Sequence, residues 1–103
     1  MALLYSLIES PTHPDFSALY RQLGVQELRF TTARKAISSL RRAAPDLLVA
    51  EFFYGYGNNY AGVNVSNLDV LLSSLRKFAP AARTIVLAAP ADARHVDKLT
   101  ALF

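Results

Sequence analysis

Four polar side chains of this sequence have the types and positions to do chemistry: Glu9, His13, Asp15 and Glu51. Glu9 and Glu51 stand at the ends of two short apolar runs that we expect to be neighbouring strands, and His13 and Asp15 begin the segment between them. Carboxylates and an imidazole in one crevice can act as general acid and base or hold a cation. A simpler explanation competes, because the helix dipole already favours an Asp at a helix start and a lone His there is ordinary surface. We therefore expect no catalytic residue, no metal and no cofactor, and keep the crevice of Glu9, Asp15 and Glu51 as an alternative binding site.

The glycine-rich segment 55–62, GYGNNYAG, is similar to two nucleotide-binding motifs and completes neither. A dinucleotide-binding fingerprint needs a third glycine where Tyr60 stands, and a phosphate-binding loop needs a lysine where Val63 stands. The pattern favours a turn-rich loop whose glycines allow positive φ angles.

Three tyrosines of this region, Tyr54, Tyr56 and Tyr60, are candidates for an interaction surface. They follow an expected strand at its carboxyl end, where ligands of open α/β sheets bind. Tyrosine combines apolar area with a hydroxyl group, which suits interfaces. We call these residues the loop tyrosines and predict that they contact a partner.

A stripe of cations, Arg34, Lys35, Arg41 and Arg42, shares one face of an expected helix and contains no acidic residue. Such a stripe can meet phosphates or an acidic protein. No aromatic residue is interleaved, and a net charge of +3 with a pI near 9.5 is modest for a nucleic-acid-binding domain. We do not expect nucleic acid as the partner, and we rank this stripe below a protein contact elsewhere.

Apolar strands and amphipathic helices alternate four times along the chain. The expected strands cover 3–8, 25–31, 47–53 and 84–89, and the expected helices run from Pro14 to Leu23, from Thr32 to Pro45, from Ser66 to Pro80 and from Asp92 to Phe103. In the second strand Leu28 and Phe30 alternate with Glu27 and Arg29, which predicts an edge strand with one face exposed to solvent. The third strand is apolar on both sides apart from Glu51, which predicts a central position. This alternation predicts an α/β fold with an open, doubly wound parallel sheet.

The first expected helix has clear start and stop signals. Thr12 stands three residues before Asp15 in capping-box spacing, Pro14 suits a first helical position, and Gly24 suits a stop. Its apolar residues have helical spacing and should share one face: Phe16, Leu19, Tyr20 and Leu23.

Length and composition fit one small domain: 103 residues, 52% of them hydrophobic, can build one core. Cysteine is absent, which excludes disulfides and thiolate sites. The amino-terminal segment lacks a basic region and is shorter than the ~20 apolar residues of a membrane span. We expect one domain over 1–103 in a cytoplasmic protein that does not enter the membrane.

The order of elements and the segment PDLLVAE at 45–51 resemble the receiver domains of bacterial response regulators. Those domains have a flavodoxin-like fold with strand order 2-1-3-4-5. The resemblance implies the order 2-1-3-4 here, with the fifth strand missing.

The resemblance also implies a chemistry whose parts are absent. In receivers an Asp at the place of Glu51 accepts a phosphoryl group, and an acidic pair at the places of Leu7 and Ile8 holds Mg²⁺. A Thr or Ser at the place of Ala88 and a Lys after the fifth strand read the phosphoryl group. The apolar pair cannot ligate a hard cation, so the resemblance implies a degenerate receiver that is not phosphorylated, is not an enzyme and acts through protein contacts. Glu51 then either imitates the phosphorylated state or, as we expect, is a solvated carboxylate at a strand end.

The strand at 84–89 should be an apolar, uncharged edge, which exposes unpaired N–H and C=O groups. Either the chain is a fragment of a longer protein that supplies a fifth strand, or a second copy covers the edge. We expect a homodimer. Its expected contact residues are Thr84, Ile85, Val86, Leu87, Val96, Leu99 and Phe103. The alternative function is a small-ligand-binding protein or small enzyme that uses the crevice at the carboxyl ends of the first and third strands.

Overall fold

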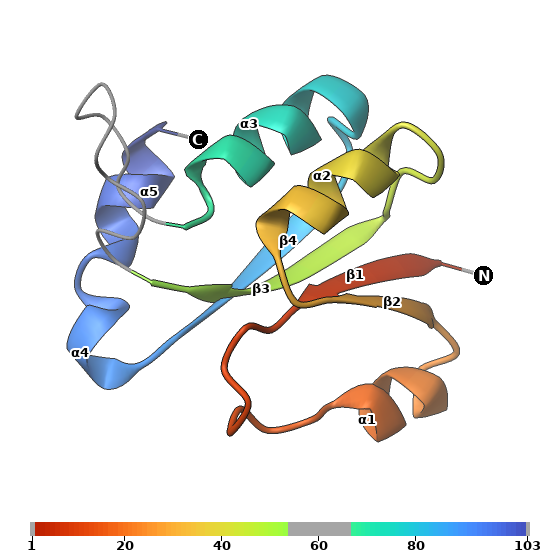
Figure 1. Ribbon diagram of the computed structural model, residues 1–103, viewed down its shortest axis with the longest axis horizontal. Helices are drawn as coiled ribbons and strands as arrows, with labels where there is room; N and C mark the ends of the chain where they lie inside the picture. The colour runs from red at the N-terminus through yellow and green to blue at the C-terminus, as the bar shows by residue number, and fades with distance from the viewer. Residues whose placement is uncertain (1, 54–66, 103) are drawn as a thin grey trace.

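Four parallel strands form one sheet in the order β2-β1-β3-β4 (Figure 1). The computed structural model describes residues 2–53 and 67–102. The strands are β1 (Leu3–Leu7), β2 (Gln26–Phe30), β3 (Leu47–Phe52) and β4 (Arg83–Ala88). In the register, Leu7 of β1 lies opposite Phe30 of β2 and Ala50 of β3. The predicted parallel sheet, its strand order and the central position of β3 are confirmed.

Helices cover both faces of this sheet. They are α1 (Ser17–Gln22), α2 (Ala33–Leu40), α3 (Asp69–Phe78), α4 (Pro90–Ala93) and α5 (Val96–Leu102). Figure 1 shows α2 and α3 side by side on one face and α1 on the other. Thr32 caps α2, since its Oγ1 accepts the backbone N–H of Lys35 at 3.3 Å. None of the helices in the described ranges is long and apolar enough to cross a membrane.

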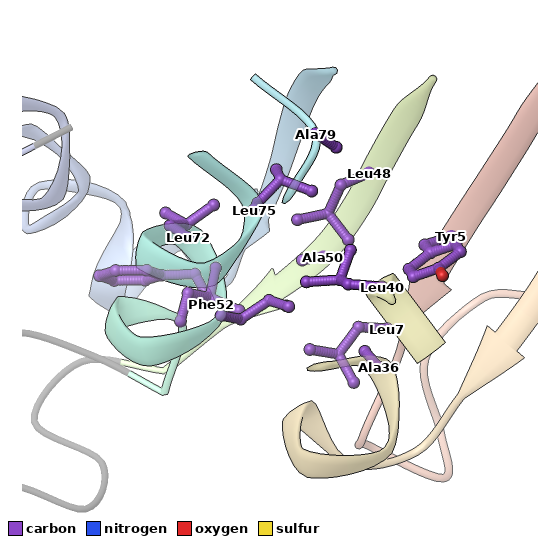
Figure 2. Packing of buried hydrophobic residues seen from close by; sticks show 12 residues of the cluster. Tyr5, Leu7, Ala36, Leu40, Leu48, Ala50, Phe52, Leu72, Leu75 and Ala79 are labelled. Atoms are coloured by element: carbon purple, nitrogen blue, oxygen red, sulfur yellow. The ribbon is translucent and has the colours of Figure 1, made fainter. Parts of the chain in front are cut away.

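The main core lies between the sheet and the helix pair α2 and α3 (Figure 2). Alternate residues of the strands face this side, and the larger ones are almost fully buried: Tyr5, Leu7, Leu48 and Phe52 from the strands, with Leu40, Leu71, Leu72 and Leu75 from the helices. Each such side chain contributes about 1.5–3 kcal/mol through burial. This packing holds the carboxyl ends of β1 and β3 next to each other.

Helix α1 begins later than its sequence signals predict. The expected start was Pro14, but the helix begins at Ser17. Phe16 is the N-cap, and the N–H of Ser17, the first residue of the helix, donates to Asp15 Oδ1 at 2.9 Å. The capping role that the spacing assigns to Thr12 is therefore not filled by Thr12. The residues before Asp15 form a turn closed by the N–H of His13 and the carbonyl of Ser10, at 3.2 Å.

The apolar face of α1 is largely uncovered. Tyr20 is buried, whereas Phe16, Leu19 and Leu23 are 38%, 49% and 66% exposed. Helix α1 contacts mainly β2, so it covers only part of its side of the sheet. Helical periodicity therefore identified the apolar face of α1, but only Tyr20 of the four residues predicted on that face is buried.

Strand β2 occupies the predicted edge, but the face expected to be exposed to solvent is partly covered. Leu28 and Phe30 pack against the main core as expected. On the other side, Glu27 lies beneath α1 and accepts hydrogen bonds from the hydroxyls of Ser6 and Ser17, both at 2.6 Å. A carboxylate with two hydroxyl donors can be half-buried without remaining unpaired.

The carboxyl-terminal segment forms two short helices instead of the single expected one. Pro90 begins α4, consistent with the preference of proline for the first helical turn. The N–H of His95 then donates to the carbonyl of Asp92 at 2.9 Å, in a turn that separates α4 from α5.

Candidate functional site

Glu51, the residue at the phosphoacceptor place, is buried at the carboxyl edge of the sheet and is 8% exposed. Its Oε1 accepts the backbone N–H groups of Glu9 and Ser10, each at 2.9 Å. These donors belong to the loop that leaves β1, the strand beside β3. The prediction of a solvated carboxylate is therefore wrong, because the adjacent loop turns two N–H groups toward it.

Asn67 joins this arrangement from the segment that enters α3. Its Nδ2 donates to Glu9 Oε2 at 2.9 Å and to the carbonyl oxygen of Glu51 at 2.8 Å, and its Oδ1 accepts the N–H of Phe53 at 2.7 Å. Three chain segments are thus tied together. We call the group formed by Glu9, Ser10, Glu51 and Asn67 the carboxylate clasp.

The clasp places two carboxylates in one hydrogen-bonded group. Burial raises the pKa of Glu51, but hydrogen bonds from Ser10 and from the N–H of Glu9, with the nearby charge of His13, outweigh burial and lower that pKa from 4.5. Glu51 is therefore held ionised by donors that belong to the chain itself.

Asp15, the third residue of the predicted crevice, lies outside the clasp. It forms an exposed ion pair with Arg29 at 3.3 Å. Hydrogen bonds from Ser17, and more weakly the charge of Arg29, lower the pKa of Asp15 below its ordinary value. Its carboxylate is engaged by the N–H of Ser17 and by Arg29, so the structure brings together Glu9 and Glu51 but not Asp15.

A hollow of about 490 Å³ lies beside Glu51 at the end of β4. Its walls combine the polar side chains of His13 and Glu51 with apolar groups, namely Pro14, Phe16, Val86, Leu87, Ala88 and Ala89. The ring of His13 is oriented by a hydrogen bond from Nδ1 to the carbonyl of Pro14 at 2.9 Å. In the part of the chain that the structure describes, no cluster of three or more His, Asp or Glu side chains could hold a metal ion.

The places of the acidic pair in receivers hold side chains of the sheet. Leu7 is fully buried in the main core, and Ile8 is half-buried with its N–H bonded to the carbonyl of Phe30 at 3.1 Å. Ala88, at the place of the Thr or Ser, is the last residue of β4. None of these three side chains offers an oxygen ligand.

The other predicted surfaces are described only in part. The loop tyrosines, Phe103, the expected helix start Ser66 and the side chain of Leu99 lie outside the described residues. Along the expected dimer edge, Thr84 and Ile85 are exposed, and the remaining described contact residues, Val86, Leu87 and Val96, are half-buried.

Asn67 is the functional residue that sequence reasoning missed. It adjoins Ser66, which stands three residues before Asp69 and was therefore predicted to start the helix. The only signal was an amide side chain at a boundary where apolar residues resume, and Asn is common at such boundaries.

No protein-family model matches this sequence, and no curated protein matches it. Among solved structures, the receiver domain of NtrC4 from Aquifex aeolicus is similar, with a TM-score of 0.67 and 14% sequence identity. The match covers 96% of this chain and 78% of that one. At this identity the likeness establishes the fold and not an activity. The chain therefore has the flavodoxin-like α/β fold of a response-regulator receiver domain, as its resemblance implied.

Proposed function

We propose that this chain is a cytoplasmic, receiver-like regulatory module that acts through protein contacts and does not accept a phosphoryl group. The observation that carries the proposal is the carboxylate clasp. Glu51 occupies the acceptor place, and its Oε1 is already engaged by two backbone N–H groups at 2.9 Å.

Phosphoryl transfer depends on positioning and on cations that neutralise the developing charge. The places that would hold Mg²⁺ in a receiver carry Leu7 and Ile8, and Leu7 is fully buried in the core. A lowered pKa also makes the Glu51 carboxylate a weaker nucleophile. These features together favour a module without phosphorylation chemistry.

Incubation with acetyl phosphate and Mg²⁺, followed by intact-mass measurement, tests this proposal. We expect the mass of the protein to stay unchanged while a competent receiver in the same tube gains one phosphoryl group. An adduct on this chain that disappears in Glu51→Gln would contradict the proposal.

Self-association through β4 is the protein contact that the fold favours. Within the described residues, β4 pairs with β3 and no strand lies along its other edge. Ile85 on this strand is 48% exposed. On the opposite face of β4 from Ile85, a groove of about 470 Å³ between α3 and α5 is lined partly by Leu72, Val86 and Val96. A second copy would cover both the edge and this groove.

Antiparallel pairing of β4 with its copy is compatible with the charges. Pairing about a two-fold axis at Val86 would place Ile85 beside Leu87 of the other copy and Arg83 opposite Ala89. The two Arg83 side chains would then stand about 20 Å apart along the strands, which is beyond the Debye length of about 8 Å at physiological salt. Light scattering at micromolar concentration should report a dimer.

Binding of a small molecule is a second candidate function, favoured by the hollow beside His13 and Glu51. Apolar walls with a few convergent polar groups are typical of ligand sites. Native mass spectrometry of the purified protein distinguishes the two functions. A retained small molecule that is lost in His13→Ala would favour the binding protein.

A further inference from the structure

Charge is divided unevenly over the fold. The segments 33–42 and 69–78, which contain α2 and α3, hold six of the eleven Lys and Arg residues and one of the eight Asp and Glu residues. The remainder of the chain holds five cations and seven acids. We call the six cations, all of them exposed, the basic face: Arg34, Lys35, Arg41, Arg42, Arg76 and Lys77.

The acids nearest in sequence do not neutralise this face. Asp69 is 8% exposed at the start of α3, and Asp46 turns its carboxylate to the N–H of Leu3 at 2.8 Å. The ion pairs found within residues 2–53 and 67–102 are those of Arg29 with Asp15 and with Glu27. The cations of the basic face therefore have no carboxylate partner among the described residues.

The basic face is continuous across the two helices. Residues 34 and 35 on α2 and residues 41 and 42 in the turn that follows it lie within one arc opposite the buried Ala36 and Leu40. At the carboxyl end of α2, the guanidinium of Arg41 lies 5.7 Å from the ring centre of Phe78, and Lys77 Nζ lies 5.4 Å from the same centre. Phe78 thus gathers cations from both helices beside each other.

Folding alone leaves two features of this arrangement unfavourable, although the last turn of α3, which holds Arg76 and Lys77, suits cations. Arg34 and Lys35 stand in the first turn of α2, which contains no acid and where the helix dipole disfavours positive charge. Arg41 and Lys77 share one aromatic ring although they repel each other. A negatively charged partner would relieve both unfavourable features.

We propose that the basic face docks an acidic segment of a partner protein, an inference that rests on the proposed function as a protein-contact module. The row from Arg34 to Arg41 is about 10 Å long, which matches three or four residues of an extended peptide. Val70 is 59% exposed on α3 and could contact an apolar residue that lies between the acidic residues of such a peptide. Nucleic acid is disfavoured because the aromatic ring of this face, Phe78, is half-buried beneath cations and is not open for base stacking.

Fluorescence anisotropy with labelled polyglutamate tests the proposal. The variant Arg34→Gln with Lys35→Gln removes two cations from the basic face. The matched control, Arg21→Gln with Arg94→Gln, removes two exposed cations elsewhere and leaves the same net charge. Because an exposed ion pair contributes about 0.2–1 kcal/mol, the first variant should bind polyglutamate about two- to thirtyfold more weakly. The control should bind as the wild type does, and urea unfolding should show both variants folded.

Three results would overturn the proposal. They are equal weakening in both variants, no binding of polyglutamate at low salt, and tighter binding of duplex DNA than of polyglutamate of equal charge. Weakening confined to the first variant, together with loss of binding at high salt, would support it. The mass and light-scattering measurements do not depend on the basic face, so failure here and failure of the proposed function are distinguishable.

Discussion

Removing the acceptor of the carboxylate clasp should destabilise the fold. In Glu51→Ala the N–H groups of Glu9 and Ser10 lose their acceptor. A hydrogen bond to a charged group contributes about 1.5–3 kcal/mol. Because these donors are only partly buried and water can replace part of each bond, we expect a total loss of about 2–4 kcal/mol. Glu51→Gln should cost about 1–2 kcal/mol, since one amide oxygen can accept both N–H groups without the charge.

The pH dependence separates this explanation from simple loss of packing. The folded-state pKa of Glu51 is lowered from 4.5. A depressed carboxyl pKa contributes stability that is fully present above the ordinary value and is lost as pH falls through the folded value. The wild type should therefore be more stable than Glu51→Gln by the full charge-dependent amount at pH 7. This difference in the free energy of unfolding should shrink below pH 4.5.

Urea unfolding at neutral pH and at several acidic pH values measures these differences directly. The Glu51→Gln variant is the matched control for size, and Glu51→Ala reports the loss of the acceptor. Equal stability of wild type and Glu51→Gln at neutral pH would refute the role of the charge. A gap that stays constant as pH falls would refute the assignment to ionisation.

Two further substitutions test the rest of the arrangement. Asn67→Ala removes three hydrogen bonds, two within the clasp and one to Phe53, and should lower the free energy of unfolding by about 2–4 kcal/mol. A loss below about 0.5 kcal/mol, within the range of ordinary surface changes, would contradict the role of Asn67 in joining the three segments. Ile85→Lys should convert the proposed dimer to a monomer in light scattering, whereas Val70→Lys, at a position 59% exposed and away from β4, should leave the dimer intact. Dissociation by both variants, or by neither, would argue against pairing through β4.

The edge position of β2 and the central position of β3 follow from the sequence pattern, whereas the full order 2-1-3-4 was implied by the resemblance to receivers. The run at 47–53 is apolar on both faces, which requires neighbours on both sides, and the alternation at Leu28 and Phe30 requires only one buried face. The start of α1 is harder to predict because Thr12 and Asp15 are both good capping residues. The turn at 11–13 keeps Thr12 away from the helix start, which lies at Ser17 with Phe16 as the N-cap, and Asp15 accepts the N–H of Ser17.

The candidate site is less predictable than the fold because its donors are backbone groups. Nothing in the residue types of Glu9 and Ser10 indicates that their N–H groups turn toward Glu51. The proximity of Glu9 and Glu51 follows from adjacent strand ends, but the burial of Glu51 depends on the loop conformation. Asn67 is 16 residues beyond Glu51, and a segment rich in Gly and Asn separates them. Spacing in the sequence gives no sign of that contact.

Two carboxylates at one end of a parallel sheet need positive charge nearby, because like charges disfavour joint ionisation. The resemblance to receivers implies that Mg²⁺ supplies this charge there. Here the amide of Asn67 donates to Glu9, and backbone N–H groups donate to Glu51. These donors are permanent parts of the chain, so the loop after β1 is held without a cation or a phosphoryl group. On the proposed function, regulation must therefore enter through surfaces that partners can reach, such as the edge of β4 and the basic face, and not through a change at Glu51.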